Sequence, residues 1–166
     1  MCINHFEPMP QPQKSGDSHP AFLLAQVGAY AASKFAERLA VLSFTPPDAG
    51  ILRLLRTDAG VSQQEMAAKL GIHPSRLVAV LDELETRDLV ERRPNPDDRR
   101  QYALHLTEKG TQALGQIGQA ARQHQETLCA ALSPEEREDL AKLLRKIADQ
   151  QGLTPGIHPG YRWMNP

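Results

Sequence analysis

Apolar residues recur at intervals of three and four over three long segments near the two ends of the chain. In residues 21–43 the apolar positions are Leu23, Leu24, Val27, Ala31, Phe35, Leu39 and Leu42. The corresponding seams are Leu114, Ile117, Ala121, His124 and Leu128 in residues 108–132, and Leu140, Leu143, Leu144 and Ile147 in residues 134–151. This spacing predicts three amphipathic helices. Because their apolar faces are wide, we expect them to pack against a second copy of the chain.

Cap and turn residues between these segments mark three shorter helices. Thr45-Pro46-Pro47-Asp48 begins a helix that carries Ile51, Leu52, Leu54 and Leu55 and ends near residues 58–60. Ser62 and Glu65 form a capping box for a second helix, which Gly71 can end in a left-handed turn. Pro74 suits the first position of a third helix, whose apolar face is Leu77, Leu81 and Leu84. Two short helices joined by a tight glycine turn predict a helix-turn-helix.

A short hairpin is predicted directly after the helix-turn-helix. Residues 89–93 and 101–106 are typical of strands, and Tyr102, Leu104 and Leu106 alternate with Ala103 and His105. The connection between them contains two prolines and two adjacent arginines. A basic-tipped hairpin in this place is a wing, and it makes the helix-turn-helix signal much more specific.

Residues 45–151 resemble the MarR family of winged-helix transcriptional regulators. The matching pieces are Thr-Pro-Pro-Asp at 45–48, Ser-Gln-Gln-Glu at 62–65, Leu-Val-Glu-Arg-Arg at 89–93, Asp-Asp-Arg-Arg at 97–100 and Leu-Thr-Glu-Lys-Gly at 106–110. The chain departs from the family at Asp88, where a glycine is usual. Asp adopts the left-handed conformation less readily than Gly, so the departure costs about 0.5–1 kcal/mol without changing the fold.

The resemblance implies a mainly α fold with a small β-hairpin wing. The DNA-binding domain is residues 45–107, and the helical dimerisation region is formed by residues 21–44 and 108–151. Residues 1–20 hold four prolines without periodicity and are predicted to be a disordered arm. Residues 152–166 form a Gly/Pro-rich tail, which is either loose or docked on the partner subunit through Tyr161 and Trp163.

The net charge of −1 means that a nucleic-acid function must rest on local clustering of basic residues. Such a cluster exists within fourteen residues and consists of Arg87, Arg92, Arg93, Arg99 and Arg100. It is diluted by Asp88, Glu91, Asp97 and Asp98, so the charges alone are also compatible with a solvated surface.

The predicted helix that begins at Pro74 is the candidate for insertion into the major groove. Its core face leaves His73, Ser75, Arg76, Ala79 and Glu83 on the other side. Arg76 can pair with a guanine, and Ser75 can bond to a donor or to an acceptor on a base edge. Ala79 can touch a thymine methyl group. A surface ion pair of Arg76 with Asp82 or Glu83 is the alternative. Gln63 and Gln64, at the start of the preceding helix, are predicted to contact phosphate.

Arg99 and Arg100 at the wing are predicted to enter a narrow minor groove. By resemblance to the family, Asp97 braces Arg99, and Arg99 is the residue that reaches the groove. A dimer with two such modules predicts double-stranded DNA with a pseudo-palindromic operator as the partner.

The same resemblance implies a small-molecule effector, often aromatic, that binds between the dimerisation helices and the winged helix. Tyr30, Phe35, Arg38 and Phe44 are the candidate ligand-binding residues, although aromatic core and a solvated arginine explain them equally well. A redox switch through Cys2 or Cys129 is an alternative, but neither thiol has a visible activator. His124 could make dimerisation or ligand binding depend on pH.

No catalytic motif, metal spacing or cofactor fingerprint occurs in the sequence, so we expect neither an enzyme nor a cofactor or metal. No apolar run is long enough to span a membrane and the N-terminus lacks a signal pattern, which predicts a cytoplasmic protein. The sequence therefore favours a homodimeric, sequence-specific repressor that a ligand releases. A winged helix used as an architectural or adaptor module without sequence preference is the remaining alternative.

Overall fold

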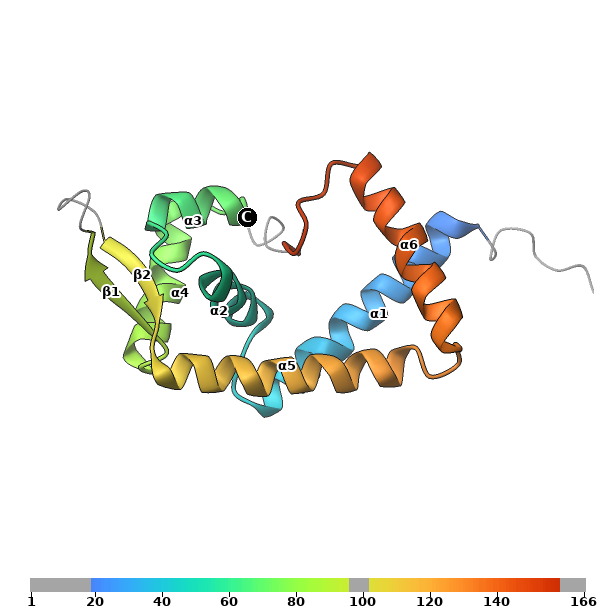
Figure 1. Ribbon diagram of the computed structural model, residues 1–166, viewed down its shortest axis with the longest axis horizontal. Coiled ribbons are helices and arrows are strands. Elements are labelled where there is room, and N and C mark those ends of the chain that lie inside the picture. The colour runs from blue at the N-terminus through green and yellow to red at the C-terminus, as the bar shows by residue number, and fades with distance from the viewer. Residues whose placement is uncertain (1–18, 96–101, 159–166) are drawn as a thin grey trace, which may run out of the picture. The chain divides into compact units, whose positions relative to one another are not determined.

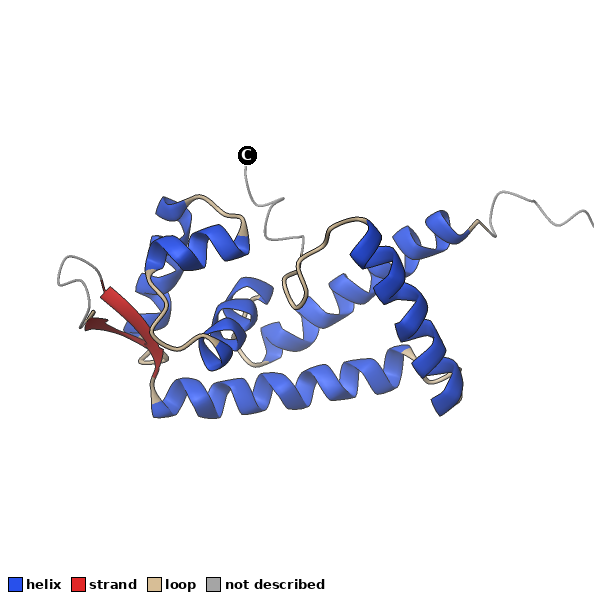
Figure 2. Cartoon of the chain, turned by 45° about the horizontal axis from the view of Figure 1, so that its top comes forward, coloured by secondary structure: helices blue, strands red, loops and turns tan. Residues whose placement is uncertain are grey.

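The computed structural model describes residues 19–95 and 102–158, which form helices and one antiparallel hairpin (Figures 1 and 2). The helices are α1 (Pro20–Val41), α2 (Pro46–Thr57), α3 (Gln63–Leu70), α4 (Pro74–Thr86), α5 (Glu108–Leu128) and α6 (Pro134–Gln150). The strands are β1 (Val90–Pro94) and β2 (Tyr102–Leu106). None of the helices in these ranges is long and apolar enough to cross a bilayer.

The chain divides into two compact units, with the boundary inside α1 after Ser33. In the first unit, the described part of α1 carries a row of large apolar side chains that are 38–58% exposed. These side chains are Phe22, Leu23, Leu24, Val27 and Tyr30. The first part of the apolar face predicted for this helix is thus exposed, whereas Leu39 of the same predicted face is fully buried in the core of the second unit.

The hydrophobic core of the second unit, which begins at Lys34, is built around α2. This helix packs against α4, α5 and β2, and it contributes Ile51, Leu52 and Leu55 as fully buried side chains. The other fully buried large residues are Leu39, Met66, Leu77, Leu81, Leu84, Val90 and Leu104. Burial of each such side chain is worth about 1.5–3 kcal/mol. The helix-turn-helix and the base of the hairpin are therefore held on one scaffold helix.

The predicted helix starts are confirmed by their hydrogen bonds. Capping boxes with both reciprocal bonds occur at Thr45, Ser62 and Ser133, and Thr107 caps α5 by accepting from the Gly110 N–H. Gly71 ends α3 with φ +66°, as its position predicted. These devices satisfy backbone groups that a helix leaves without partners at its ends.

The predicted end of the penultimate helix near Leu132 is wrong by four residues. Regular helix stops at Leu128, and the following turn is closed by a bond from the Leu132 N–H to the Cys129 carbonyl. Arg137 of α6 donates from Nε to the carbonyl oxygens of both Cys129 and Leu132. Those carbonyls thus gain a partner from another helix, which stabilises a turn in place of a further helical turn.

Two helices end at residues other than glycine in the left-handed conformation. Ser43 ends α1 with φ +60°, and Asp88 follows α4 with φ +59°. The Leu89 N–H donates back to the Leu84 carbonyl, as is typical of this helix ending, and both leucines are buried. The conformation expected for Asp88, where the family usually has glycine, is thus present.

The two strands pair from Val90 opposite Leu106 to Pro94 opposite Tyr102. A third backbone segment joins the hairpin, because the Gly60 N–H donates to the Leu104 carbonyl and the Leu104 N–H donates to Val61. Leu104 is fully buried and its neighbour Ala103 is 4% exposed, whereas Tyr102 is 55% exposed. Tyr102 lies at the outer end of the strand, opposite Pro94. Residues 96–101, which include the wing arginines, lie outside the described residues.

We expect Gly110→Ala to destabilise the protein by more than about 2 kcal/mol. A Cβ at Gly110 would lie 1.9 Å from the carbonyl oxygen of Leu89, so α5 or the end of α4 would have to move. Chemical denaturation followed by circular dichroism measures the change. Gly115→Ala is the matched control, because a Cβ there meets nothing within 4 Å. This second variant should gain roughly 0.5–1 kcal/mol from helix propensity, and equal effects of the two variants would contradict the packing argument.

Candidate nucleic-acid interface

The recognition helix candidate, α4, has a buried side and an exposed side. Leu77, Leu81 and Leu84 are fully buried against the core. The exposed residues at helical spacing are Ser75, Val78, Ala79 and Asp82. At the start of the helix, His73 is the N-cap, and its Nδ1 lies 3.3 Å from the Ser75 N–H and 2.8 Å from the Ser75 Oγ. His73 and Ser75 are therefore oriented by each other at the exposed beginning of α4.

Arg76 lies in the first turn of the same helix and is partly exposed. Within the described ranges, its guanidinium takes part in no hydrogen bond or ion pair. The two carboxylates considered as its partners from the sequence are bound elsewhere, since Asp82 pairs with Arg92 and Glu83 with Arg87. The guanidinium is thus free to contact a ligand in solution.

Val78 is an exposed residue of this face that the sequence reasoning missed. Its side chain is 37% exposed, next to Ala79 and one turn after Ser75. An exposed valine beside an alanine presents methyl groups, which suit contact with a thymine methyl group in the major groove. The three-residue spacing from Ser75 is the signal that could have identified Val78.

Arg92 neutralises the acidic second half of α4. Its Nη2 lies 2.6 Å from Asp82 Oδ1, and its other terminal nitrogen bonds to the Glu85 carboxylate. The Arg92 side chain is 16% exposed, so this pairing occurs partly out of water. Arg93 of β1 forms an exposed ion pair with Glu91. These two members of the predicted basic cluster are therefore occupied by acidic neighbours.

Arg87, the third described member of the cluster, is bound at the end of α4. Its Nη2 donates to the Ser43 carbonyl over 2.8 Å, and its guanidinium lies 4.6 Å from the centre of the Phe44 ring. The nearest carboxylates are those of Asp48 at 3.7 Å and Glu83 at 3.8 Å. Arg87 is thus engaged in contacts within the protein and is not a free cation for a phosphate group.

Gln63 and Gln64, the predicted phosphate contacts, lie at the first turn of α3, and Gln64 is exposed. The same helix end carries the carboxylate of Glu65, whose pKa is lowered by bonds from the Ser62 N–H and hydroxyl. This charge opposes an anion at that place. Asp97, Arg99 and Arg100 lie outside the described residues.

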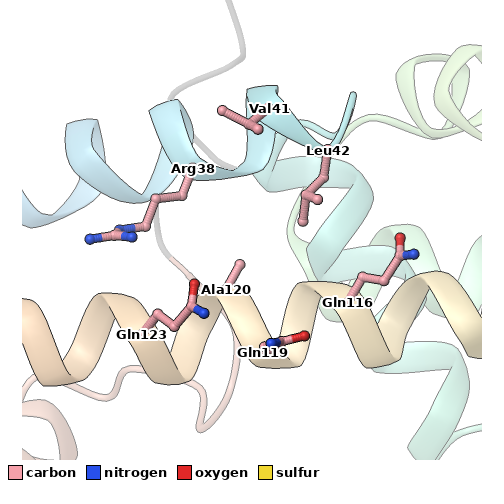
Figure 3. A pocket seen from close by; sticks show the side chains of 7 residues that line it. All are labelled: Arg38, Val41, Leu42, Gln116, Gln119, Ala120 and Gln123. Atoms are coloured by element: carbon pink, nitrogen blue, oxygen red, sulfur yellow. The ribbon is translucent and has the colours of Figure 1, made fainter.

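A second candidate site is a groove between the C-terminal part of α1 and the middle of α5, with a volume of about 450 Å³ (Figure 3). It is lined by Arg38, Val41, Leu42, Gln116, Gln119, Ala120 and Gln123. One cation, three amides and three apolar side chains suit a small molecule that has an apolar body and an anionic or polar end.

Of the four residues predicted to bind a ligand, only Arg38 lines this groove. Phe35 packs against His124 with ring centroids 5.4 Å apart. Phe44 is 7% exposed and lies under Arg87, so it belongs to the core. Tyr30 is in the first unit and is 58% exposed. The structure therefore brings together a different set of residues around Arg38, mainly the glutamines of α5.

His124 of α5 is a titratable residue that Arg38 of this groove influences. Burial lowers the pKa of its imidazole, and the positive charge of Arg38 lowers it further. Arg38 itself is held by a bond from Nη2 to the Thr127 hydroxyl, 3.1 Å long. Protonation of His124 would place a second positive charge beside Arg38 and Phe35.

We expect the free energy of unfolding to decrease as pH falls below about 6.5, the value for an unperturbed histidine. The folded pKa of His124 lies below that of the unfolded chain, so the unfolded chain binds more protons in the window between them. Urea unfolding at a series of pH values measures the slope. His124→Gln should reduce that slope, and an imidazole titration by NMR should show a higher pKa in Arg38→Met. An unchanged slope in His124→Gln would contradict the assignment.

The sequence matches a protein-family model described as the MarR family over residues 44–102. A Thauera aromatica protein, named as a transcriptional regulatory protein for the hcr operon, is 37% identical over 111 residues, which are 67% of each chain. The match to the family model covers the helix-turn-helix and the first wing strand.

Solved structures agree with the sequence comparison. The transcriptional repressor CouR, solved bound to a 23-mer DNA duplex, is 32% identical with a TM-score of 0.71, and the match covers 82% of this chain and 98% of CouR. A MarR family protein of Mycobacterium tuberculosis, solved with salicylic acid, is 25% identical with a TM-score of 0.65 over 80% of this chain and 98% of that one. On this agreement of fold, capped helix-turn-helix and sequence, the chain belongs to the MarR family of winged-helix transcriptional regulators.

Proposed function

We propose that this regulator is a homodimeric repressor that binds a pseudo-palindromic DNA operator and is released by a small molecule. The observation that carries the DNA-binding part is the outer face of α4, where Arg76 has no partner among the described residues and stands beside Ser75, Val78 and Ala79. CouR, which shares the fold at 32% identity, was solved on duplex DNA. We also propose that the protein acts in the cytoplasm.

The residues of α4 divide into base-reading and orienting groups. Arg76 can donate two hydrogen bonds to a guanine, whereas Val78 and Ala79 can contact thymine methyl groups. His73 orients Ser75 for a base or a phosphate. Gln63, Gln64, Arg99 and Arg100 are proposed to contact the DNA backbone or minor groove, with Asp97 bracing Arg99. Sequence preference then comes mainly from the first half of α4.

The homodimer is supported by apolar surface on the terminal helices. None of the residues of α6 is buried, although the helix carries an apolar stripe. The stripe consists of Leu140, Leu143, Leu144 and Ile147, whose side chains are 38–58% exposed. The first part of α1 carries a comparable exposed row. Exposed apolar surface of this extent marks an interaction site. A second copy of the chain is its proposed occupant, because a pseudo-palindromic operator requires two reading modules.

The α1–α5 groove is the proposed effector site. Arg38 can bind a carboxylate, the glutamines can bond to hydroxyl groups, and Val41, Leu42 and Ala120 can contact a ring. The related Mycobacterium tuberculosis protein was solved with salicylic acid, which has this combination of groups. We therefore propose an aromatic acid as the class of effector. A coupling of about 1–3 kcal/mol between the two sites would change DNA affinity 5- to 150-fold.

Selection of duplexes from a random pool by the purified protein should enrich a two-part sequence. Arg76→Ala should weaken binding to that sequence by roughly 1–3 kcal/mol and relax the preference at one base position in each half-site. Fluorescence anisotropy with selected and scrambled duplexes across a salt series measures both effects.

Arg99→Ala is the comparison for that experiment, because loss of a backbone or minor-groove contact should weaken binding more evenly over all sequences. Enrichment of no sequence by the parent protein would leave an architectural role and reject the proposed function. Parent-like binding by Arg76→Ala would reject only the assignment of Arg76 as a base-reading residue.

Leu143→Glu should shift the protein from dimer to monomer in sedimentation velocity, because it places a charge on the exposed stripe of α6, where Leu143 is 58% exposed. Lys146→Glu is the control, since it changes the charge of the same helix at a position outside the stripe. A dimer that tolerates Leu143→Glu would place the interface elsewhere.

A further inference from the structure

Arg87 stands where the ends of two helices meet. It is the C-cap residue of α4, and its side chain reaches the end of α1. Both helices end in the same way, because the Phe44 N–H donates to the Leu39 carbonyl and the Leu89 N–H donates to the Leu84 carbonyl, each over 2.9 Å. The guanidinium of Arg87 joins these two endings through its bond to the Ser43 carbonyl.

The surroundings of Arg87 explain why a guanidinium suits this place. Helix C-termini carry partial negative charge, so a cation beside two of them is favourable. The carboxylate of Asp48, in the first turn of α2 and 3% exposed, lies 3.7 Å from Nη1. The Cζ atom of the guanidinium lies over the Phe44 ring, 4.6 Å from its centre. Lysine could supply the charge but neither the stacking nor the paired donors.

These contacts attach α4 to α1 and α2 at one end only. The proposed base-reading residues occupy the other end of α4, with Arg76 eleven residues before Arg87. At a rise of 1.5 Å per residue the two positions are roughly 17 Å apart along the helix. A rotation of about 10° at Arg87 would then move Arg76 by about 3 Å, which is the length of a hydrogen bond.

We propose that Arg87 is a positioning residue for DNA recognition. It fixes the angle of α4 against the corner between α1 and α2, so that Arg76 meets its base in each half-site. The inference rests on the proposed function, and it adds a residue that touches no DNA. A purely structural role would lower stability without changing how the folded protein reads the spacing of half-sites.

The test uses full-length Arg87→Met, Arg87→Lys and a matched control, Arg137→Met. Arg137 also donates to carbonyl oxygens at a helix end, those of Cys129 and Leu132 after α5, at 3.0 and 3.1 Å. A duplex selected by the parent protein is compared with duplexes that have one base pair added or removed between the half-sites. Affinities are measured at a temperature where circular dichroism shows each variant to be folded.

We expect Arg87→Met to bind the selected duplex at least tenfold more weakly than the parent does. The ratio of its affinities for the selected and the altered spacings should fall toward one. The slope of log affinity against log salt should not change, because no phosphate contact is lost. Arg87→Lys should lie between the parent and Arg87→Met, and Arg137→Met should keep the parent's spacing preference. If Arg87→Met does not fold, the same comparison is made with Arg87→Lys and Asp48→Asn.

A folded Arg87→Met variant with affinity and spacing preference within twofold of the parent would overturn the inference and leave the proposed function intact. If the parent protein itself enriches no sequence, the proposed function fails and the inference fails with it.

Discussion

The close contact between the first turn of α5 and the end of α4 is the constraint on which the rest of this fold depends. Only a glycine at position 110 allows the helix to approach the Leu89 carbonyl, where a Cβ would come within 1.9 Å. Thr107 strengthens the same junction, because its N–H donates to Leu89 and its hydroxyl to Asp88, at 3.2 and 2.7 Å. The first turn of α5 is thereby bound directly to the residues that end α4.

Two helices, α5 and α1, therefore make their contacts with α4 at the same end of that helix. Thr107 and Gly110 contact the residues directly after α4, and the Ser43 carbonyl at the end of α1 accepts a hydrogen bond from the guanidinium of Arg87. The α1–α5 groove lies between those same two helices. A molecule bound in the groove would change the distance or angle between α1 and α5. Such a change would shift the contacts at the end of α4, about 17 Å from its proposed base-reading residues.

The local signals in the sequence were sufficient for the helix starts, because a capping box is complete within four residues. Ser62 with Glu65 and Ser133 with Glu136 predicted their helices for this reason. The left-handed Asp88 was also predicted, through its place in the family pattern. The fold class and the order of elements follow from such signals.

The roles of the arginines could not be predicted in the same way, because their partners are brought close only by folding. Arg87 bonds to a residue 44 positions away, and Arg92 bridges from β1 to two carboxylates of α4. As a result, the three arginines of the predicted basic cluster that the structure describes are bound by groups of the protein itself. Val78 was missed because an apolar side chain in an amphipathic helix is usually assigned to the buried face, whereas this one is 37% exposed.

The pairing of Arg92 with Asp82 and Glu85 in the second half of α4 affects how strongly the protein would bind DNA without sequence preference. Non-specific affinity for DNA comes almost entirely from cations that replace counterions on phosphates. Because Arg87, Arg92 and Arg93 are paired with carboxylates, these three residues contribute little of this sequence-independent attraction. If the protein binds an operator as proposed, its affinity would therefore depend more on contacts with bases, such as those of Arg76, than on these three charges.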